Sequence, residues 1–335
     1  ENLLEYLTKT NPSHIITQAS IMNSRIFKNI LPNTKIYAWN QHDHNVEFIR
    51  QSYANADDIN SIDKFIFVSR WQAKRFPMIP NEKKIVMQNA ISSLLMTGKY
   101  DYNMTMKKKI IVYLHAPYRG LTLIHDIFQR IRSQIPDVTL RIFSSMSRDF
   151  KKCLINDRGD YSPLNELSAD AVHEHDRIYL NYYNSLIKTQ GIEYYGAVPQ
   201  CILFKHCQEA MVNLYPNIFP ETCCTSILET MYMGCNVVST NLGALPETSS
   251  GLIDMINLPF DIEKDRKSVS DWMIKPVTPM EIGETWCQNI ADIVINRING
   301  YHTIENQSLI HQCIDYVRDG KTWGHKVETF RKLLE

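Results

Sequence analysis

A strand–helix–strand pattern over residues 212–247 constrains the fold of this chain more than any other segment. The apolar run VNLYP opens it, the β-branched run NVVST follows at residues 236–240, and a predicted helix lies between them. Two short buried strands joined through a helix are typical of a parallel β-sheet. Ligands of open α/β sheets bind beyond the carboxyl ends of the strands, and here this region carries Glu221 and Glu229. The pattern therefore predicts both a fold class and a candidate site.

The same alternation extends over most of the chain and divides it into two series. Predicted strands of the first series lie at residues 14–18, 35–39, 64–69 and 84–88, and those of the second begin at residues 109–115, 138–143 and 192–196. Residues 89–105 have no clean period and are predicted to link the series, and residues 144–170 are predicted to form a polar surface excursion. The fold class is therefore α/β, with two Rossmann-like domains. The first domain is short of strands, as if roughly its opening half were missing.

Composition narrows the classes of function. The 335 residues are 44% apolar and 21% charged, as in an ordinary globular protein. With 36 basic and 36 acidic residues, the chain has no net field that would attract nucleic acid or an anionic membrane. No apolar run approaches the roughly 20 residues of a membrane span, and no signal peptide is recognised. Eight cysteines without a CxxC or zinc-binding spacing indicate free thiols in a reducing compartment, and we expect a cytoplasmic protein.

The spacing of Glu221 and Glu229 argues against a hydrolase. On one helix, eight residues would separate them by about 12 Å, whereas the two carboxyl groups of a glycosidase lie roughly 5 to 10 Å apart. Carboxylates spread along an extended ligand can instead accept hydrogen bonds from its hydroxyl groups. For Glu229 an alternative stays open, because Ser226 and Glu229 match the S-x-x-E pattern of a helix capping box. Glu221 follows Pro220 in a segment without period, which favours a functional role.

The sequence PNIFPETCCTSILETMYMGCNVVSTNLGALPE at residues 216–247 resembles the signature of glycosyltransferase family 4. Members of that family are retaining enzymes with the GT-B fold, in which two Rossmann-like domains face a cleft, and they carry a Glu-x7-Glu motif. Glu221 and Glu229 match that spacing, and a glycine turn at residues 233–235 and a G-x-x-P-E loop at residues 243–247 follow in the family's order. The combination of these features in order is a far more specific signal than the two glutamates alone.

A second segment, IIVYLHAPYRGLTLIHDIF at residues 110–128, is similar to the first strand and helix of the family's C-terminal domain. It ends its turn with Arg119 and Gly120, where an arginine fork, free N–H groups and the helix dipole suit a diphosphate. Many relatives carry another basic residue five positions earlier, where this chain has Leu114 with His115 beside it, a weak candidate. The alternative for Arg119 is an ordinary surface cation.

In the first half of the chain, YAWNQHDHN at residues 37–45 resembles a loop that relatives place near the donor sugar, and we expect His42 to face the cleft. His42, Asp43 and His44 also suggest a metal site, but alternate residues of one loop without a distant partner make a poor ligand set, and no metal is expected. The segments 64–76 and 84–91 resemble the family as well, although Ala90 replaces a glycine there.

The resemblance implies an N-terminal, acceptor-side domain at residues 1–98 and a nucleotide-sugar-binding domain at residues 99–320. A closing helix at residues 321–335 would pack back on the first domain. Glu229 would hold ribose hydroxyls, Arg119 the diphosphate and Glu221 sugar hydroxyls. The implied catalytic residues are Glu221 and His42, and the implied donor-binding residues are Arg119, Gly120, Glu229, Gly243, Ala244 and Leu245.

The implied activity is that of a retaining, hexosyltransferase-like enzyme. It would transfer a sugar from a UDP- or GDP-linked donor to an acceptor hydroxyl of a glycan, protein or lipid, without a metal or another cofactor. Three alternatives stay open. They are a sugar-nucleotide epimerase of the same fold, a non-catalytic module that binds sugar nucleotides or glycans, and a glycoside phosphorylase, which ranks last because no extra basic phosphate ligands are found.

Overall fold

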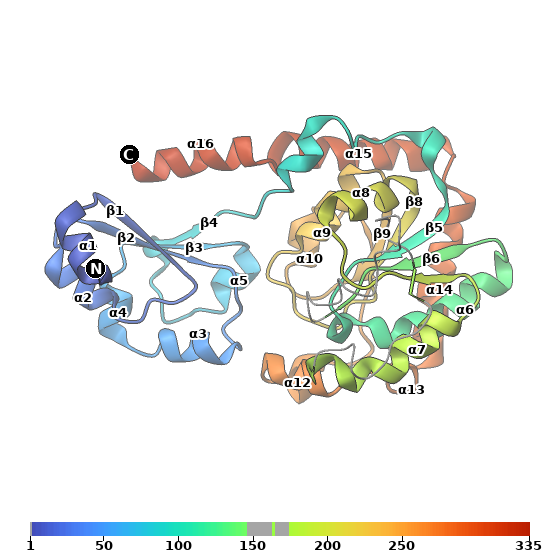
Figure 1. The fold of residues 1–335 in the computed structure, drawn as a ribbon, viewed down its shortest axis with the longest axis horizontal. Helices are drawn as coiled ribbons and strands as arrows, with labels where there is room; N and C mark the ends of the chain where they lie inside the picture. The colour runs from blue at the N-terminus through green and yellow to red at the C-terminus, as the bar shows by residue number, and fades with distance from the viewer. Residues whose placement is uncertain (1, 146–162, 165–173) are drawn as a thin grey trace.

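The computed structural model describes residues 2–145, 163–164 and 174–335, and it contains two parallel β-sheets (Figure 1). The smaller sheet has four strands in the order β1-β2-β3-β4, all parallel. These strands are β1 (His14–Gln18), β2 (Lys35–Asn40), β3 (Lys64–Phe67) and β4 (Lys84–Val86). Each overlaps a segment for which the sequence predicts a strand, because short β-branched and aromatic runs bounded by polar turns mark parallel strands.

The larger sheet has six strands in the order β10-β9-β8-β5-β6-β7. They are β5 (Lys108–Tyr113), β6 (Thr139–Ile142), β7 (Ile192–Tyr194), β8 (Ala210–Leu214), β9 (Asn236–Thr240) and β10 (Asp254–Ile256). Every residue of β8 and β9 is buried, including the polar Asn213, Asn236, Ser239 and Thr240, as is typical of central strands covered on both faces. The chain thus has the mixed α/β architecture that the sequence predicts.

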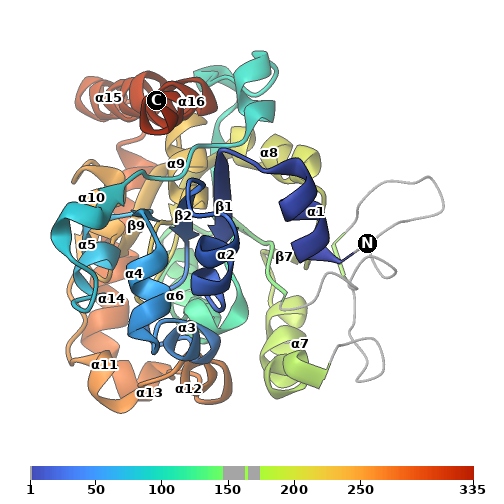
Figure 2. The ribbon, with the colours of Figure 1, turned by 90° about the vertical axis from the view of Figure 1, so that its left-hand side faces the viewer.

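Helices cover both sheets (Figures 1 and 2). Beside the first sheet lie α1 (Leu3–Thr10), α2 (Ser24–Ile30), α3 (Glu47–Ser52), α4 (Ala56–Ser61) and α5 (Arg70–Lys74). Around the second lie α6 (Leu121–Gln134), α7 (Leu180–Lys188), α8 (Gln200–Glu209), α9 (Thr225–Tyr232), α10 (Leu245–Ser249), α11 (Ile262–Asp265), α12 (Val269–Ile274), α13 (Pro279–Ile282) and α14 (Glu284–Asn299). Two long helices close the chain, α15 (Ile304–Gly320) and α16 (Trp323–Leu334).

The last helix reaches from one sheet to the other. In Figure 1, α15 runs beside the larger sheet and α16 extends toward the smaller one. Phe330 and Leu333 of α16 pack against a buried cluster of Tyr37, Ile66 and Met87 on the first sheet. The Tyr37 hydroxyl donates a hydrogen bond of 3.1 Å to the carbonyl oxygen of Leu333. The end of the chain therefore packs against the first sheet, with its apolar side chains partly buried.

The structure adds elements that the sequence analysis left as irregular. The polar stretch after residue 258 contains α11 and α12, whose first turns are capped by the side chains of Asp261 and Ser268. Strand β10 has only three residues, too few to show a period. Most of the predicted surface excursion at residues 144–170 lies outside the described residues. The domain boundary near residue 98 and the shortened first domain stay predictions.

Within the described part of the chain, no helix is both long enough and apolar enough to cross a bilayer.

Candidate functional site

A cavity of about 380 Å³ lies between the two sheets. The first sheet contributes the turns after β1, β2 and β4, and the second contributes Arg119 and the segment from Glu221 to the start of α9. The lining residues are Gln18, Ala19, Gln41, His42, Asn89, Arg119, Glu221, Thr222, Cys223, Cys224, Thr225 and Ser226. The cavity therefore sits at the carboxyl ends of parallel strands, where α/β folds bind ligands.

Arg119 and Glu221 form an ion pair at this cavity. Arg119 Nη1 donates to Glu221 Oε1 over 2.6 Å, and the buried Tyr215 hydroxyl donates to the same oxygen over 2.5 Å. Burial alone would lower the pKa of Arg119, but Glu221 and the neighbouring ionisable groups together outweigh burial, and the pKa is raised well above its ordinary value. The guanidinium lies 5.0 Å from the ring centre of Phe219, and its Nε has no hydrogen-bond partner. Arg119 thus keeps its charge and an unused donor.

The backbone of Glu221 is fixed by the loop after β9. The Ala244 amide donates to the Glu221 carbonyl over 2.7 Å. Gly243 has a φ of 64°, a backbone conformation that favours glycine, and a Cβ added there would lie 2.6 Å from the Glu221 nitrogen. Both the backbone conformation and the lack of space therefore require glycine at this position. The Leu245 amide donates to Leu242, and Leu245 is fully buried. The Ala244 amide thus positions Glu221, and the Leu245 amide is used within its own loop. The expected contact of this loop with sugar or phosphates would therefore use other backbone groups.

Gly120 brings the start of α6 close to the end of β8. Its φ is 116°, and a Cβ would lie 2.2 Å from the Pro216 carbonyl oxygen. Arg119 occupies the last position of the short 3₁₀ turn that precedes α6. The close approach explains how residues separated by about a hundred positions, Arg119 and Glu221, come to share a cavity.

Glu229 lies on α9 and is not among the side chains that line the cavity. Its Oε1 accepts hydrogen bonds from the Ser92 amide at 3.1 Å and from Gln200 Nε2 at 3.4 Å. Desolvation raises its pKa to about 7, against a smaller lowering by the Ser92 amide. The capping-box alternative is wrong, because Cys224 is the N-cap residue and Ser226 already lies inside the helix. Glu229 is a buried carboxyl group held by the segment that links the two sheets.

His42 is exposed at the cavity, as expected from the sequence. Its backbone is held by two hydrogen bonds, from its own amide to Asn40 Oδ1 at 2.9 Å and from Gln72 Nε2 to its carbonyl at 2.7 Å. Partial desolvation lowers the pKa of the imidazole. The neighbouring Asp43 is occupied elsewhere, because it accepts a hydrogen bond of 2.8 Å from Arg75 Nε. Of His42, Asp43 and His44, only His42 lines the cavity.

Among the described residues, one group has ligand atoms close enough to suggest a metal ion: His115, Glu221 and Cys224, within 4.8 Å of one another. The Arg119 cation already pairs with Glu221, which opposes a second cation. Desolvation raises the pKa of the Cys224 thiol, whereas a bound metal requires the thiolate. These residues therefore do not fit a divalent ion.

The buried side chain of His115 stacks on Tyr215, with ring centres 3.3 Å apart. Desolvation and the Arg119 charge lower its pKa well below the ordinary value, so the ring is neutral. His115 Nδ1 lies 3.4 Å from the Ser226 hydroxyl, and its Nε2 has no partner. The sequence analysis named His115 only as a weak phosphate ligand, and the structure makes it a neutral support for Tyr215.

Two further residues shape the site without having been expected to do so. Gln72 holds the His42 loop, and Glu247 joins the two halves of the chain. The Glu247 carboxylate accepts hydrogen bonds from the amides of Arg70 at 2.9 Å and Trp71 at 3.1 Å. The sequence signal for this contact was the glutamate of the G-x-x-P-E loop, because a carboxylate is a favourable partner for the free amides at the start of a helix.

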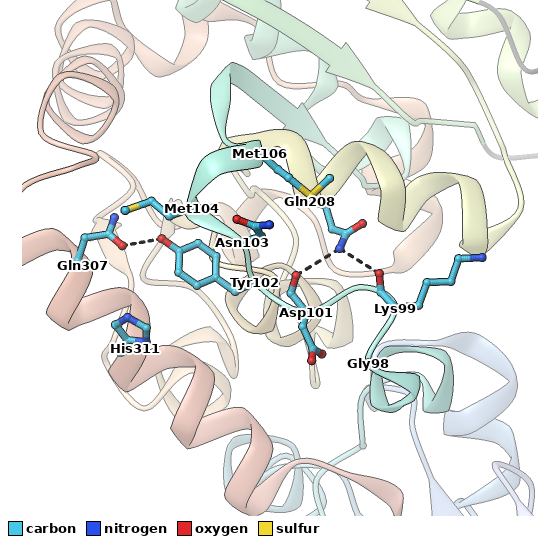
Figure 3. Close-up of a pocket in the computed structure, with 10 residues that line it drawn as sticks. All are labelled: Gly98, Lys99, Asp101, Tyr102, Asn103, Met104, Met106, Gln208, Gln307 and His311. Atoms are coloured by element: carbon cyan, nitrogen blue, oxygen red, sulfur yellow. Dashed lines mark hydrogen bonds between the residues drawn. The ribbon is translucent and has the colours of Figure 1, made fainter.

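A larger cavity of about 720 Å³ lies elsewhere, between the linker, α8 and α15 (Figure 3). Tyr102 donates to Gln307 over 2.5 Å, and Gln208 donates to the carbonyls of Lys99 and Asp101 over 3.2 Å each. These polar groups fasten the linker to the second sheet's helices. None of the predicted site residues lines this cavity, and size alone does not make it the candidate site.

Comparison with solved structures defines the class of fold. TarM matches with a TM-score of 0.59 and 12% identity over 99% of this chain and 57% of its own. The pneumococcal O-GlcNAc transferase GtfA in complex with UDP and GlcNAc matches with a TM-score of 0.60 and 10% identity over 99% and 59%. HepE from Anabaena in complex with UDP matches with 0.66 and 12% over 99% and 81%. The expected GT-B fold is confirmed.

The comparisons leave the family open. No protein-family model and no curated protein sequence matches the chain. The chain spans less than two thirds of the length of TarM and of GtfA. Identities of 10–12% show likeness of fold, and membership of family 4 stays a prediction from the sequence.

Proposed function

We propose that this protein is a retaining glycosyltransferase that uses a nucleotide-activated sugar as donor. The observation that carries the proposal is the meeting of Arg119, Glu221 and His42 in one cavity between the two sheets. A cation, a carboxylate and an imidazole at the carboxyl ends of parallel strands suit a ligand that has both phosphates and hydroxyl groups. UDP-bound HepE and GtfA, which have the same fold, support a nucleotide sugar as the ligand.

In this proposal Arg119 binds the diphosphate of the donor. Its ion pair with Glu221 holds the guanidinium at the cavity wall, and the rings of Phe219 and Tyr118 flank it with centres 5.0 and 5.4 Å away. Phosphate oxygens would take up the donors that Glu221 does not use. Glu221 would then be free to accept hydrogen bonds from sugar hydroxyls, and His42 would approach the sugar from the other sheet.

The reaction would depend on stabilising the leaving group. As the bond from the sugar to the diphosphate breaks, negative charge grows on the phosphate oxygens, and a fixed arginine stabilises that charge. The acceptor hydroxyl would attack from the side of the leaving group, and the leaving phosphate would take its proton. Closure of the two halves around the donor would exclude water, which otherwise hydrolyses it. Glu229 would act on the ribose side, and no metal takes part in the proposal.

The test is an assay of the full chain with UDP- and GDP-linked hexoses. Nucleoside diphosphate and sugar products are separated by chromatography, first with water as the acceptor and then with a panel of hydroxyl acceptors. Release of nucleoside diphosphate with retained configuration at the sugar supports a retaining transferase. An intact sugar nucleotide with an inverted sugar centre indicates an epimerase. Binding without turnover of any donor would leave a non-catalytic module, and the enzyme proposal would fail.

The same proposal includes uridine or guanosine as the donor base, a hydroxyl group as the acceptor, and a cytoplasmic location for the protein. Because turns of the first sheet form one side of the cavity, opposite Arg119 and Glu221, we expect the acceptor, whether glycan, protein or lipid, to contact that side.

A further inference from the structure

A separate cavity of about 370 Å³ between the two halves of the chain is lined by three basic side chains and one acidic side chain among other residues. Its volume is that of a small-molecule site. Arg70, Lys321 and Lys326 face one carboxylate among the described lining residues, Glu247. The remaining lining residues are Val86, Met87, Gln88, Ser250, Tyr316 and Thr329. None of the residues of the candidate donor site is among them.

The carboxylate in this cavity is already engaged. Both oxygens of Glu247 accept backbone hydrogen bonds, from Arg70 at 2.9 Å and Trp71 at 3.1 Å. Arg70, Lys321 and Lys326 form no ion pair with any carboxylate in the described residues. Three cations therefore share this cavity with a single carboxylate, and two of them, Lys321 and Lys326, are half-buried. This excess of positive charge is unusual, because charges taken out of water are normally paired.

The two lysines also act on each other. Lys321 Nζ contacts Gln88 Oε1 and lies 4.7 Å from the ring centre of Tyr316. Burial and the nearby charge of Lys326 lower the pKa of Lys321, and burial lowers the pKa of Lys326. Each ammonium group is thus destabilised in its charged form, and an anion between them would remove that cost.

We propose that this cavity binds a phosphate-class anion, either inorganic phosphate or the phosphoryl group of a small phosphomonoester. The Arg70 guanidinium can bind two of its oxygens in a fork, and Lys321 and Lys326 supply point charges. The inference goes beyond the proposed glycosyl transfer, because this cavity and the candidate donor cavity share no lining residue.

The position of the cavity gives the bound anion a structural effect. Arg70 begins α5 beside the first sheet, whereas Lys321 and Lys326 lie where the chain passes from α15 to α16. At this crossing the Ile91 amide of the linker donates to the Lys321 carbonyl over 2.8 Å. An anion held by all three cations would hold the two halves of the chain together at their connection.

The test measures thermal unfolding of the full chain as inorganic phosphate or glycerol 3-phosphate is added, with ionic strength held constant by sodium chloride. Lys326→Gln and Arg70→Gln remove cations from the cavity, and Arg70→Gln leaves its backbone bond to Glu247 intact. Lys332→Gln is the matched control, because Lys332 lies on the same helix and its side chain is 71% exposed. Arg119→Ala reports on the candidate donor site instead.

We expect the wild type, Lys332→Gln and Arg119→Ala to show a saturable rise in the melting temperature. The two cavity variants should need about ten to a hundred times more ligand, the effect of one charged hydrogen bond. Phosphate also stabilises proteins non-specifically, so an equal rise in every variant would overturn the proposal. Loss of the effect in Arg119→Ala alone would assign the anion to the donor site and also overturn it. If both esterified and free phosphate bind, the lower midpoint identifies the preferred form.

Discussion

Arg119 Nη1 lies 2.6 Å from Glu221 Oε1, so the cation and the carboxylate predicted to bind different parts of one ligand are partners of each other. The pair holds both side chains at the cavity wall and lets them exchange partners when a ligand with phosphates and hydroxyl groups enters. This relationship leads to the first prediction.

Replacing Arg119 by alanine should weaken binding of UDP or GDP by about 1.5–3 kcal/mol, the usual contribution of a hydrogen bond to a charged group. Isothermal titration with both nucleotides measures the change. Arg130→Ala is a suitable control, because Arg130 lies on α6, the helix that follows the turn of Arg119, and pairs with Asp126 away from the cavity. Equal affinities of Arg119→Ala and the wild type would remove Arg119 from the donor site.

The two glutamates should differ in what their loss affects. Glu221→Ala should mainly reduce turnover, because Glu221 lines the cavity where the sugar is proposed to lie. Glu229→Ala should mainly reduce nucleotide affinity. Initial rates and titrations on both variants separate the effects. If Glu229→Ala only lowered the melting temperature and left nucleotide binding intact, Glu229 would be a structural residue that fastens Ser92.

Stability should depend on pH through Glu229. Its pKa is raised from 4.5 to about 7, so between these values the folded protein holds a proton that the unfolded chain releases. Stability should therefore fall as pH rises from about 4.5 to 7, by up to about 3 kcal/mol. Urea unfolding at pH 5 and pH 8 should show a smaller fall in Glu229→Gln than in the wild type. Parallel pH profiles of the two proteins would contradict the raised pKa.

Gly243→Ala should destabilise the protein more than Gly251→Ala. Both positions have positive φ angles, 64° and 72°, and each substitution carries about 1–3 kcal/mol of backbone strain. Only at Gly243 would the new methyl group also meet backbone, 2.6 Å from the Glu221 nitrogen, whereas nothing lies within 4 Å at Gly251. Overpacking adds about 1–3 kcal/mol more, which chemical denaturation can resolve. Equal losses would mean that the loop moves away from Glu221 freely.

Removing the Glu247 carboxylate should loosen the contact between the two halves of the chain. In Glu247→Ala the amides of Arg70 and Trp71 lose their acceptors, so their hydrogen exchange should accelerate relative to the wild type. Exchange followed by mass spectrometry over the α5 peptide measures this, with the β8 peptide as an internal control. Unchanged protection of α5 would show that other contacts hold it.

The strands were predictable because their signal is local. Each described strand except β10 falls in a segment whose apolar, β-branched composition marks it, with ends shifted by a few residues. The S-x-x-E match at Ser226 and Glu229 shows the limit of local patterns. It depends on where the helix begins, and the helix begins two residues too early for it. A capping-box match in a sequence predicts a cap only where the first residue of the helix is itself predicted correctly.

The pairing of the site residues was beyond the sequence. Arg119 and Glu221 are 102 positions apart, and their contact depends on the approach of Gly120 to Pro216. The use of the Ala244 amide to hold Glu221 could not be foreseen either, because any backbone amide can donate to any carbonyl. The sequence named the residues around the cavity, and packing decided which of them contact each other.

The contact of Gly243 with the backbone of Glu221 has a consequence for protein engineering. The loop after β8 and the loop after β9 are in close backbone contact and have complementary shapes, so neither can be exchanged alone. A graft that imports a new loop in place of residues 216–224 must bring its matching loop at residues 241–247, or Glu221 will lose its position. The unit of redesign in this protein is the pair of loops.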